Sequence, residues 1–261
     1  MALTPPIILL GRGGSGTRIL SELAGASGIF LGNRLNKSGD SEEWIDLVYR
    51  MVMEVGGGYT LPCGPRYRDE IRECANAILE SGNVIGETLW GWKLPETMLL
   101  VPLFIDAFPD AKIIHIVRNP ILSSLRRSHM TSRLGNPIGD IVLPAAYDYA
   151  GRDRSLISKD ETYLHNAYSW NYQVRRVTEF LHGSLNDRSH IELRYEDVCS
   201  APQEAITNVR AFVGAPADGA PFRLELETAR MGMCDTKDSR VSAIWEICGE
   251  TAEALGYQLL P

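Results

Sequence analysis

The sequence predicts a single α/β domain in which helices cover both faces of a central parallel sheet, a three-layer α/β/α arrangement. First, short continuous apolar runs at residues 7–10 and 112–117 are typical of strands buried on both faces. Second, segments with apolar residues at helical spacing separate these runs, so strands and helices alternate along the chain. Third, a length of 261 residues without an internal repeat fits one large domain spanning residues 1–261.

The first third of the chain begins with a strand at residues 7–10. This strand stops at a glycine-rich turn, residues 11–16, and a helix follows directly. A second helix is predicted over 41–55, because a serine and two glutamates stand at its start and the glycines 56–58 at its end. A third helix is predicted over 66–79, where a Ser-Gly pair ends the pattern soon afterwards.

The remaining elements follow from the same patterns of spacing. Strands are predicted over 89–94, 112–117 and 191–195, and helices over 98–108, 160–182, 202–213 and 241–255. Pro120 is placed to be the first residue of a further helix after the strand 112–117. Residues 131–160 carry glycines and prolines without regular spacing, so we expect an irregular segment, with 131–165 forming a mobile lid or specificity segment.

The composition is that of a globular protein and excludes several classes. Hydrophobic residues make up 44% and charged residues 23%, and the formal net charge of −7 argues against a nucleic-acid partner. No stretch approaches the roughly 20 apolar residues of a membrane span, and the apolar run at 7–10 is too short for a signal peptide. The five cysteines form no C-x-x-C pair and predict reduced thiols in a cytoplasmic protein: Cys63, Cys74, Cys199, Cys234 and Cys248.

The glycine-rich turn at residues 11–18 predicts an anion-binding loop. It follows a strand and opens a helix, so its backbone N–H groups and the helix N-terminus favour a bound phosphate. Its spacing matches the beginning of a Walker A loop, but Thr17 stands where the lysine is required and Arg18 where the Mg²⁺-binding hydroxyl is required. This pattern argues against NTP hydrolysis. The alternative interpretation is a plain strand-to-helix turn.

A second motif follows the strand 112–117, which ends in Arg118. A P-loop NTPase often needs an acid at such a strand end to organise Mg²⁺, whereas a guanidinium favours direct, metal-free phosphate recognition. Ser124 and Arg126 are expected on the next helix, where their spacing can direct several donors at one anion. For the neighbouring Arg127 we favour an exposed, solvated side chain.

With both motifs in view, the sequence resembles the family of sulfotransferases that use 3′-phosphoadenosine 5′-phosphosulfate (PAPS). The similarity extends over nearly the whole chain. It is carried by the loop 13–18, the lysine-bearing strand end 91–95, the strand and arginine of 111–120, the R-Y-E-D segment within 193–198 and the ending 254–257. The resemblance implies a P-loop-containing NTPase-like α/β/α fold, with PAPS as co-substrate and no metal.

The resemblance also implies which residues bind the nucleotide. Binding of the 5′-phosphosulfate is expected of Arg12, Gly13, Gly14, Ser15, Gly16, Thr17 and Arg18. Binding of the 3′-phosphate and adenine is expected of Arg118, Ser124, Arg126, Tyr195, Lys237 and Arg240. For Tyr195 the alternative is a side chain of the hydrophobic core.

For catalysis, the resemblance implies that Lys93 and Arg18 stabilise charge in the transition state. The acceptor, a hydroxyl or amine of a carbohydrate or small molecule, must lose a proton, and we expect Asp40 to be the general base. The alternative bases are Glu42, Glu96 and His129.

Three positions depart from the family pattern. Gly14 replaces a loop lysine or arginine, Arg126 replaces a serine of the 3′-phosphate motif, and Pro95 replaces a histidine that some members use as the base. Gly14 and Pro95 keep open a module that binds the nucleotide without turnover. A kinase-like P-loop transferase is a further alternative, although it would need Mg²⁺ and a lysine that the loop lacks.

Overall fold

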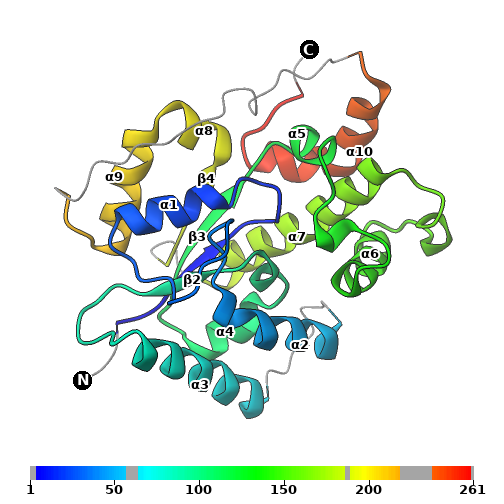
Figure 1. The fold of residues 1–261 in the computed structure, drawn as a ribbon. Helices are drawn as coiled ribbons and strands as arrows, with labels where there is room; N and C mark the ends of the chain where they lie inside the picture. The colour runs from blue at the N-terminus through cyan, green and yellow to red at the C-terminus, as the bar shows by residue number, and fades with distance from the viewer. Residues whose placement is uncertain (1–3, 57–63, 186–188, 218–236, 260–261) are drawn as a thin grey trace.

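The computed structural model describes residues 4–56, 64–185, 189–217 and 237–259. Its centre is a four-stranded parallel sheet in the order β2-β1-β3-β4 (Figure 1). The strands are β1 (Ile7–Leu10), β2 (Gly91–Lys93), β3 (Lys112–Val117) and β4 (His190–Arg194). Because all neighbours are parallel, the carboxyl ends of the four strands meet at one edge of the sheet.

The register decides which residues reach that edge. Leu9 pairs with Lys93, the last residue of β2, and Val117 at the end of β3 pairs with Arg194 at the end of β4. The loop that follows Leu10 therefore begins beside the ends of the neighbouring strands.

One face of the sheet is covered by three helices. Ile7 and Leu9 of β1 point into a core shared with α1 (Arg18–Ala26), α8 (Tyr195–Ser200) and α9 (Pro202–Val213). These helices lie together on one side of the sheet in Figure 1. Side chains that alternate along β1 point to opposite faces, so Ile8 and Leu10 belong to the other core.

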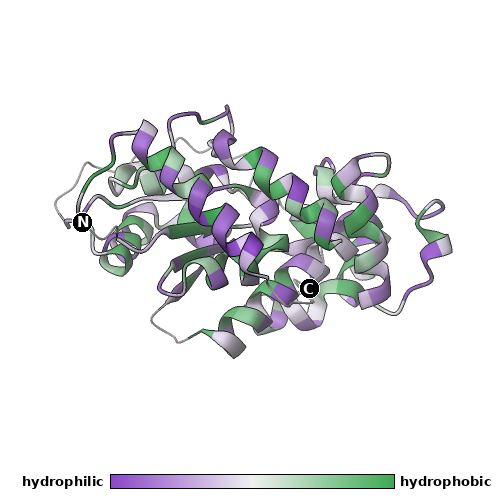
Figure 2. Ribbon diagram, turned by 90° about the horizontal axis from the view of Figure 1, so that it is seen from below, coloured by the Kyte–Doolittle hydropathy of each residue, from purple (hydrophilic) through white to green (hydrophobic). Residues whose placement is uncertain are grey.

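The other face carries the larger hydrophobic core and the remaining α-helices of the described residues. They are α2 (Ile45–Val55), α3 (Pro65–Ser81), α4 (Val101–Ala107), α5 (Pro120–Ser124), α6 (Pro137–Tyr149), α7 (Thr162–Ser184) and α10 (Ser239–Ala254). Hydrophilic and hydrophobic residues alternate along the helices (Figure 2), as expected of helices with one face on a core. The predicted three-layer α/β arrangement is thereby confirmed.

Local chemistry sets several helix ends. The side chain of Asn136 accepts hydrogen bonds from the backbone N–H groups of Ile138 and Gly139 at the start of α6. Gly56 ends α2 in the left-handed conformation, with φ 69°, as the glycine signal predicts. Gly57 and Gly58 lie outside the described residues.

The prediction of an irregular segment over 131–160 is wrong, because α6 occupies residues 137–149. The helix has strong start signals in Asn136 and Pro137, and it contains Pro144. A Cβ atom on Gly139 would lie 2.1 Å from the carbonyl oxygen of Arg133, so this glycine permits close packing of α6 on the preceding turn. The glycines and prolines that predicted irregularity are therefore used for helix starts and close contacts.

Two further elements differ from prediction. The expected helix 98–108 is divided into the 3₁₀ helix Pro95–Leu99 and α4, since Leu100 leaves the helical conformation and Pro102 has no N–H to donate. The helix expected after Arg118 is only α5, so Arg126 lies beyond its end and not on it. The short helix α8, directly after β4, was not predicted.

None of the helices that the structure describes combines the length and the apolar character needed to cross a membrane.

Candidate active site

Residues predicted to bind anions lie after the carboxyl ends of all four strands. The loop 11–17 follows β1, Lys93 ends β2, Arg118 follows β3 and Tyr195 follows β4. In open α/β sheets ligands bind outside this edge. The topology therefore brings together segments as far apart in the chain as Gly11 and Tyr195.

Glycines shape the loop between β1 and α1. Gly14 has φ +90° and Gly16 has φ +86°, a conformation that residues with a side chain rarely adopt. The backbone N–H of Ser15 donates to the carbonyl of Arg12 at 2.9 Å, which closes the turn. A Cβ atom on Gly16 would lie 2.1 Å from the ring of Tyr195, so the loop also needs glycine for its close contact with the end of β4.

Two buried hydroxyls support an anionic ligand at this edge. The Oγ atoms of Ser15 and Ser124 are buried and have no hydrogen-bond partner among the described residues. A buried polar group without a partner costs about 1–3 kcal/mol, which a phosphate or sulfate oxygen would relieve. Both serines are among the residues that the sequence predicts to bind the nucleotide.

Arg12 belongs to this loop, and its side chain is buried. Its guanidinium donates to the Oγ of Ser132 at 2.8 Å, to the Oδ1 of Asn166 at 3.3 Å and to the carbonyl of Gly13 at 3.3 Å. Burial lowers the pKa of Arg12 to about 10, opposed by the nearby Cys248. The side chain therefore remains a cation at neutral pH.

Lys93 and Asp40 form a buried ion pair. The ammonium of Lys93 donates to a carboxylate oxygen of Asp40 and to the carbonyl of Ser38 at 2.8 Å, and its side chain is 1% exposed. The other carboxylate oxygen of Asp40 accepts from Asn36 at 2.8 Å. Desolvation lowers the pKa of Lys93 against the opposing effect of Asp40, and the charge of Arg18 adds to the lowering. The three predicted catalytic residues are thus brought into one neighbourhood.

The alternative bases Glu96 and His129 form a second pair nearby. Oε1 of Glu96 lies 3.7 Å from Nε2 of His129, whose ring packs against Gly13. Burial, with a contribution from the charge of Asp40, raises the pKa of Glu96 to about 7. Burial also lowers the pKa of His129 to about 3, so this imidazole is neutral at pH 7.

The remaining alternative base, Glu42, begins a 3₁₀ helix that runs to Trp44. Its backbone N–H donates to the carbonyl of Arg34 at 2.9 Å. The carboxylate of the adjacent Glu43 accepts hydrogen bonds from the backbone N–H groups of Asn33 and Arg34, so this side chain stabilises the local fold.

Arg118 stacks on Tyr195 at the ends of β3 and β4. The carbon of the guanidinium lies 4.2 Å from the centroid of the ring, and both side chains are buried. Desolvation lowers the pKa of Arg118, and the charge of Arg126 lowers it further. An anion bound near Arg118 and Arg126 would offset the repulsion between these two charges.

Three of the predicted 3′-phosphate residues line one pocket. Ser124, Arg126 and Arg240 lie around a space of about 410 Å³ together with acidic and aromatic side chains of the 160–163 segment. Arg240 also forms an ion pair with Asp238 at 2.6 Å. Lys237 is exposed and is not among the residues that line this pocket.

Sequence reasoning missed the polar side chains of α7 that support the site. Asn166, Ser169 and Gln173 are buried on this helix at spacing i, i+3 and i+7. Such a stripe of polar residues on one face of a helix is the signal that could have found them.

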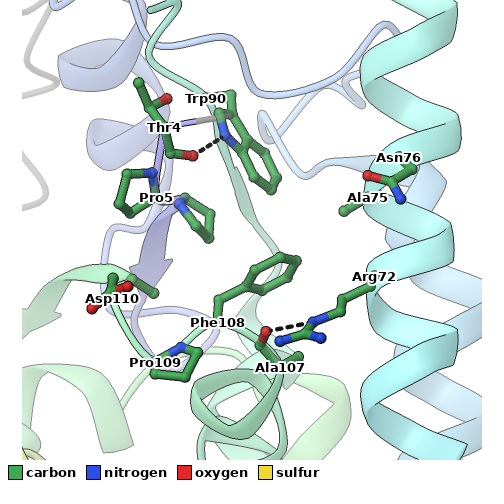
Figure 3. Close-up of a pocket in the computed structure, with 12 residues that line it drawn as sticks. Thr4, Pro5, Arg72, Ala75, Asn76, Trp90, Ala107, Phe108, Pro109 and Asp110 are labelled. Carbon is green, nitrogen blue, oxygen red and sulfur yellow. Dashed lines mark hydrogen bonds between the residues drawn. The ribbon is translucent and has the colours of Figure 1, made fainter. Parts of the chain in front are cut away.

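A second pocket lies at the opposite edge of the sheet, where the strands begin (Figure 3). Trp90 and Phe108 form part of its walls, and Arg72 of α3 donates to the carbonyl of Ala107 at its rim. Its volume is about 250 Å³. It contains none of the predicted site residues.

Among the described residues, no group of three or more His, Cys, Asp or Glu side chains is placed to hold a metal ion.

Comparisons with solved structures show the fold. A sulfotransferase from Alicyclobacillus acidocaldarius is similar with a TM-score of 0.53 and 14% identity, over 99% of this chain and 98% of that one. The sulfotransferase domain of the Synechococcus PCC 7002 olefin synthase is similar with a TM-score of 0.53 and 15% identity, over 99% of this chain and 96% of that one. Sulfotransferase STF9 from Mycobacterium avium is similar with a TM-score of 0.54 and 14% identity, over 99% of this chain and 78% of that one. At these identities the likeness shows that the chain has the P-loop-like sulfotransferase fold.

Comparison of the sequence itself decides the family. Among curated proteins, none matches this sequence. A family model described as "Sulfotransferase family" matches residues 6–219. Because this match covers most of the 261 residues, the chain belongs to the sulfotransferase family.

Proposed function

We propose that this protein transfers the sulfuryl group of PAPS to a hydroxyl or amine of a carbohydrate or small-molecule acceptor. One observation carries the proposal: two groups of residues that are predicted to bind anions lie at the same edge of the sheet. The glycine loop and Lys93 form one group, and Arg118, Ser124 and Arg126 form the other. PAPS is charged at two ends, a 5′-phosphosulfate and a 3′-phosphate, and so offers one anion to each group.

The 5′ end would be held by the loop. The backbone N–H groups of Gly13, Gly14, Gly16 and Thr17 are the donors offered to the ligand, since that of Ser15 already donates to the carbonyl of Arg12. The buried Oγ of Ser15 lacks a partner among the described residues. Arg18, the first residue of α1, is exposed and adds positive charge. Thr17 replaces the lysine of a Walker A loop, which favours PAPS over an NTP with Mg²⁺.

The 3′ end would be held by Arg118, with Ser124, Arg126 and Arg240 around the pocket next to it. A guanidinium offers a planar fork of donors that fits two phosphate oxygens. Tyr195 stacks on Arg118, and in this proposal its ring lies on the adenine side of the nucleotide.

In the reaction, PAPS supplies an activated sulfuryl group with its own leaving group, the bisphosphate. The acceptor atom forms a bond to sulfur while the bond from sulfur to the bridging phosphate oxygen breaks. Lys93 and Arg18 provide positive charge where negative charge develops. Asp40 takes the proton of the acceptor in this proposal, and its contact with Lys93 keeps it near the same edge.

We also propose a cytoplasmic location. Cys74, Cys199 and Cys248 are free thiols, which fits a reducing compartment. Cys63 and Cys234 lie outside the described residues.

Calorimetric titration tests the nucleotide. We expect adenosine 3′,5′-bisphosphate to bind without Mg²⁺, AMP to bind more weakly and ATP with Mg²⁺ not to bind. Arg118→Ala should lower the affinity for the bisphosphate by about tenfold or more, because a buried charge-assisted contact is lost. Arg127→Ala, at an exposed neighbouring arginine, is the matched control and should bind as the wild type does.

A screen of hydroxyl and amine acceptors with labelled PAPS then tests turnover. Binding of Mg-ATP in place of the bisphosphate would instead indicate a kinase-like transferase. Binding of the bisphosphate without transfer to any acceptor or to water would indicate a non-catalytic nucleotide-binding module.

A further inference from the structure

Arg12 is a buried cation whose hydrogen-bond acceptors are all neutral. It is 2% exposed, and it donates to a serine hydroxyl, an asparagine amide and a backbone carbonyl. Among the described residues no carboxylate oxygen lies within ion-pair distance of it, whereas Arg152 and Arg175 have carboxylate partners. A buried charge without an opposite charge is costly, so the position of Arg12 favours an anion bound at the loop.

Asn166 on α7 is the most connected of the acceptors of Arg12. Its side-chain oxygen accepts from Arg12 at 3.3 Å and from the Oγ of Ser132 at 2.7 Å. Its side-chain nitrogen donates to the carbonyl of Ser124 at 2.9 Å and to that of Arg126 at 3.1 Å. Carbonyl oxygens can only accept, so these partners fix the orientation of the amide.

These contacts join the two anion-binding groups. Arg12 belongs to the glycine loop, since one of its terminal nitrogens lies 4.0 Å from the position of a Cβ atom on Gly14. Ser124 and Arg126 belong to the other group and line its pocket. Asn166 is fully buried and contacts both, so one side chain sets the spacing between the loop and the 124–126 turn.

An amide serves both tasks where a carboxylate cannot. Aspartate has the same shape, but its oxygens cannot donate to the carbonyls of Ser124 and Arg126. It would also place a negative charge on Arg12 and compete with a bound anion for that cation.

We propose that Asn166 is a positioning residue that keeps Arg12 available to the bound anion and couples the loop to the 124–126 turn, so that one ligand engages both. The inference rests on the proposed function, because it requires a ligand with an anion at each end.

The test compares Asn166→Asp with Asn171→Asp by calorimetry, using adenosine 3′,5′-bisphosphate and AMP as probes. Asn171 is the matched control: it is a buried asparagine on the same helix, its oxygen accepts from Thr251 at 2.6 Å, and it lies outside these contacts. Asn166→Asp should lower the affinity for both ligands by about tenfold or more, as expected when the buried charge of Arg12 is neutralised. Asn171→Asp should stay within about threefold of the wild type.

Asn166→Ser separates the coupling from the charge. It removes the tie to the 124–126 turn without adding a charge, so the preference for bisphosphate over AMP should fall by about tenfold while AMP affinity changes little. A purely structural role would lower the melting temperature without changing this preference. If Asn166→Asp does not fold, Arg12→Gln decides the charge argument and should weaken both ligands.

An unchanged preference in Asn166→Ser would overturn the coupling. If Asn166→Asp, or Arg12→Gln in its place, bound the bisphosphate and AMP as tightly as the wild type does, the proposed role of the Arg12 charge in anion binding would be overturned. Failure of the wild-type protein to bind the bisphosphate would overturn the proposed function itself, which separates that result from a failure confined to the variants.

Discussion

The guanidinium carbon of Arg118 lies 4.2 Å from the centroid of the Tyr195 ring. The same ring fills the space beside Gly16, where a Cβ atom would lie 2.1 Å from it. Tyr195 therefore connects the ends of β3 and β4 to the glycine loop. It also keeps the plane of Arg118 fixed before any ligand binds, which lowers the entropy lost on binding.

This stacking predicts that charge alone does not suffice at position 118. Arg118→Lys keeps the charge but loses the planar fork and the stacking, so we expect the affinity for the bisphosphate to fall by about tenfold. Tyr195→Phe keeps the ring and should bind within about threefold of the wild type, whereas Tyr195→Leu should resemble Arg118→Lys. Calorimetry measures all three, and wild-type affinity in Arg118→Lys would show that the stacking is unimportant.

The loop predicts a contrast between two glycines. Gly16→Ala should destabilise the protein by about 1–3 kcal/mol, because φ is +86° and the new methyl group meets the Tyr195 ring. Gly25 lies inside α1 with open space around it, so Gly25→Ala should stabilise by up to about 1 kcal/mol. Urea unfolding measures both, and equal effects of the two substitutions would contradict the described loop geometry.

The buried ion pair predicts unequal losses from its two partners. The side chain of Lys93 is 1% exposed and that of Asp40 is 16% exposed. Asp40→Asn leaves a buried ammonium without a carboxylate and should cost about 3 kcal/mol of stability, while Lys93→Met should cost less. The double variant should lose less than the sum, with a coupling energy of about 1–3 kcal/mol. Additive losses in urea unfolding would show that the pair does not form in solution.

Local patterns were sufficient for several elements. The strand at 112–117 and the helix at 202–213 begin and end at the predicted residues, because an apolar run or stripe is bounded by breakers on both sides. The loop 11–18 and Arg118 are identified as candidates for a similar reason, since their position after a strand is visible in the sequence and the structure has them there. The parallel topology then places them together without further information.

The rest depends on contacts between distant segments. In the sequence Gly139 indicates irregular structure, but in the fold it lets α6 pack closely on the carbonyls of Met130 and Arg133. Asn166 gave no functional signal, because its partners in the loop and in the 124–126 turn come near only in the folded chain. The pairing of Glu96 with His129 is likewise a product of packing, as 33 residues separate them.

That last pair predicts opposing pH dependences. Burial raises the pKa of Glu96 from 4.5 to about 7, so between these values the folded state binds more protons and stability falls as pH rises. Burial lowers the pKa of His129 from 6.5 to about 3, so between these values the unfolded state binds more protons and stability rises with pH. The two effects overlap between pH 4.5 and 6.5 and offset each other there.

Removing one partner should therefore reveal the other. Glu96→Gln leaves the effect of His129, so its stability should rise by about 2–3 kcal/mol more than that of the wild type between pH 4.5 and 6.5. His129→Asn leaves the effect of Glu96 and should show the opposite slope, with stability falling over the same range. Asp40 and Lys93 act on both groups and are unchanged in both variants. Urea unfolding at several pH values measures the slopes, with the exposed Glu73→Gln of α3 as control. Parallel pH profiles for the two variants would mean that Glu96 and His129 are not buried together, because only burial gives their slopes opposite signs.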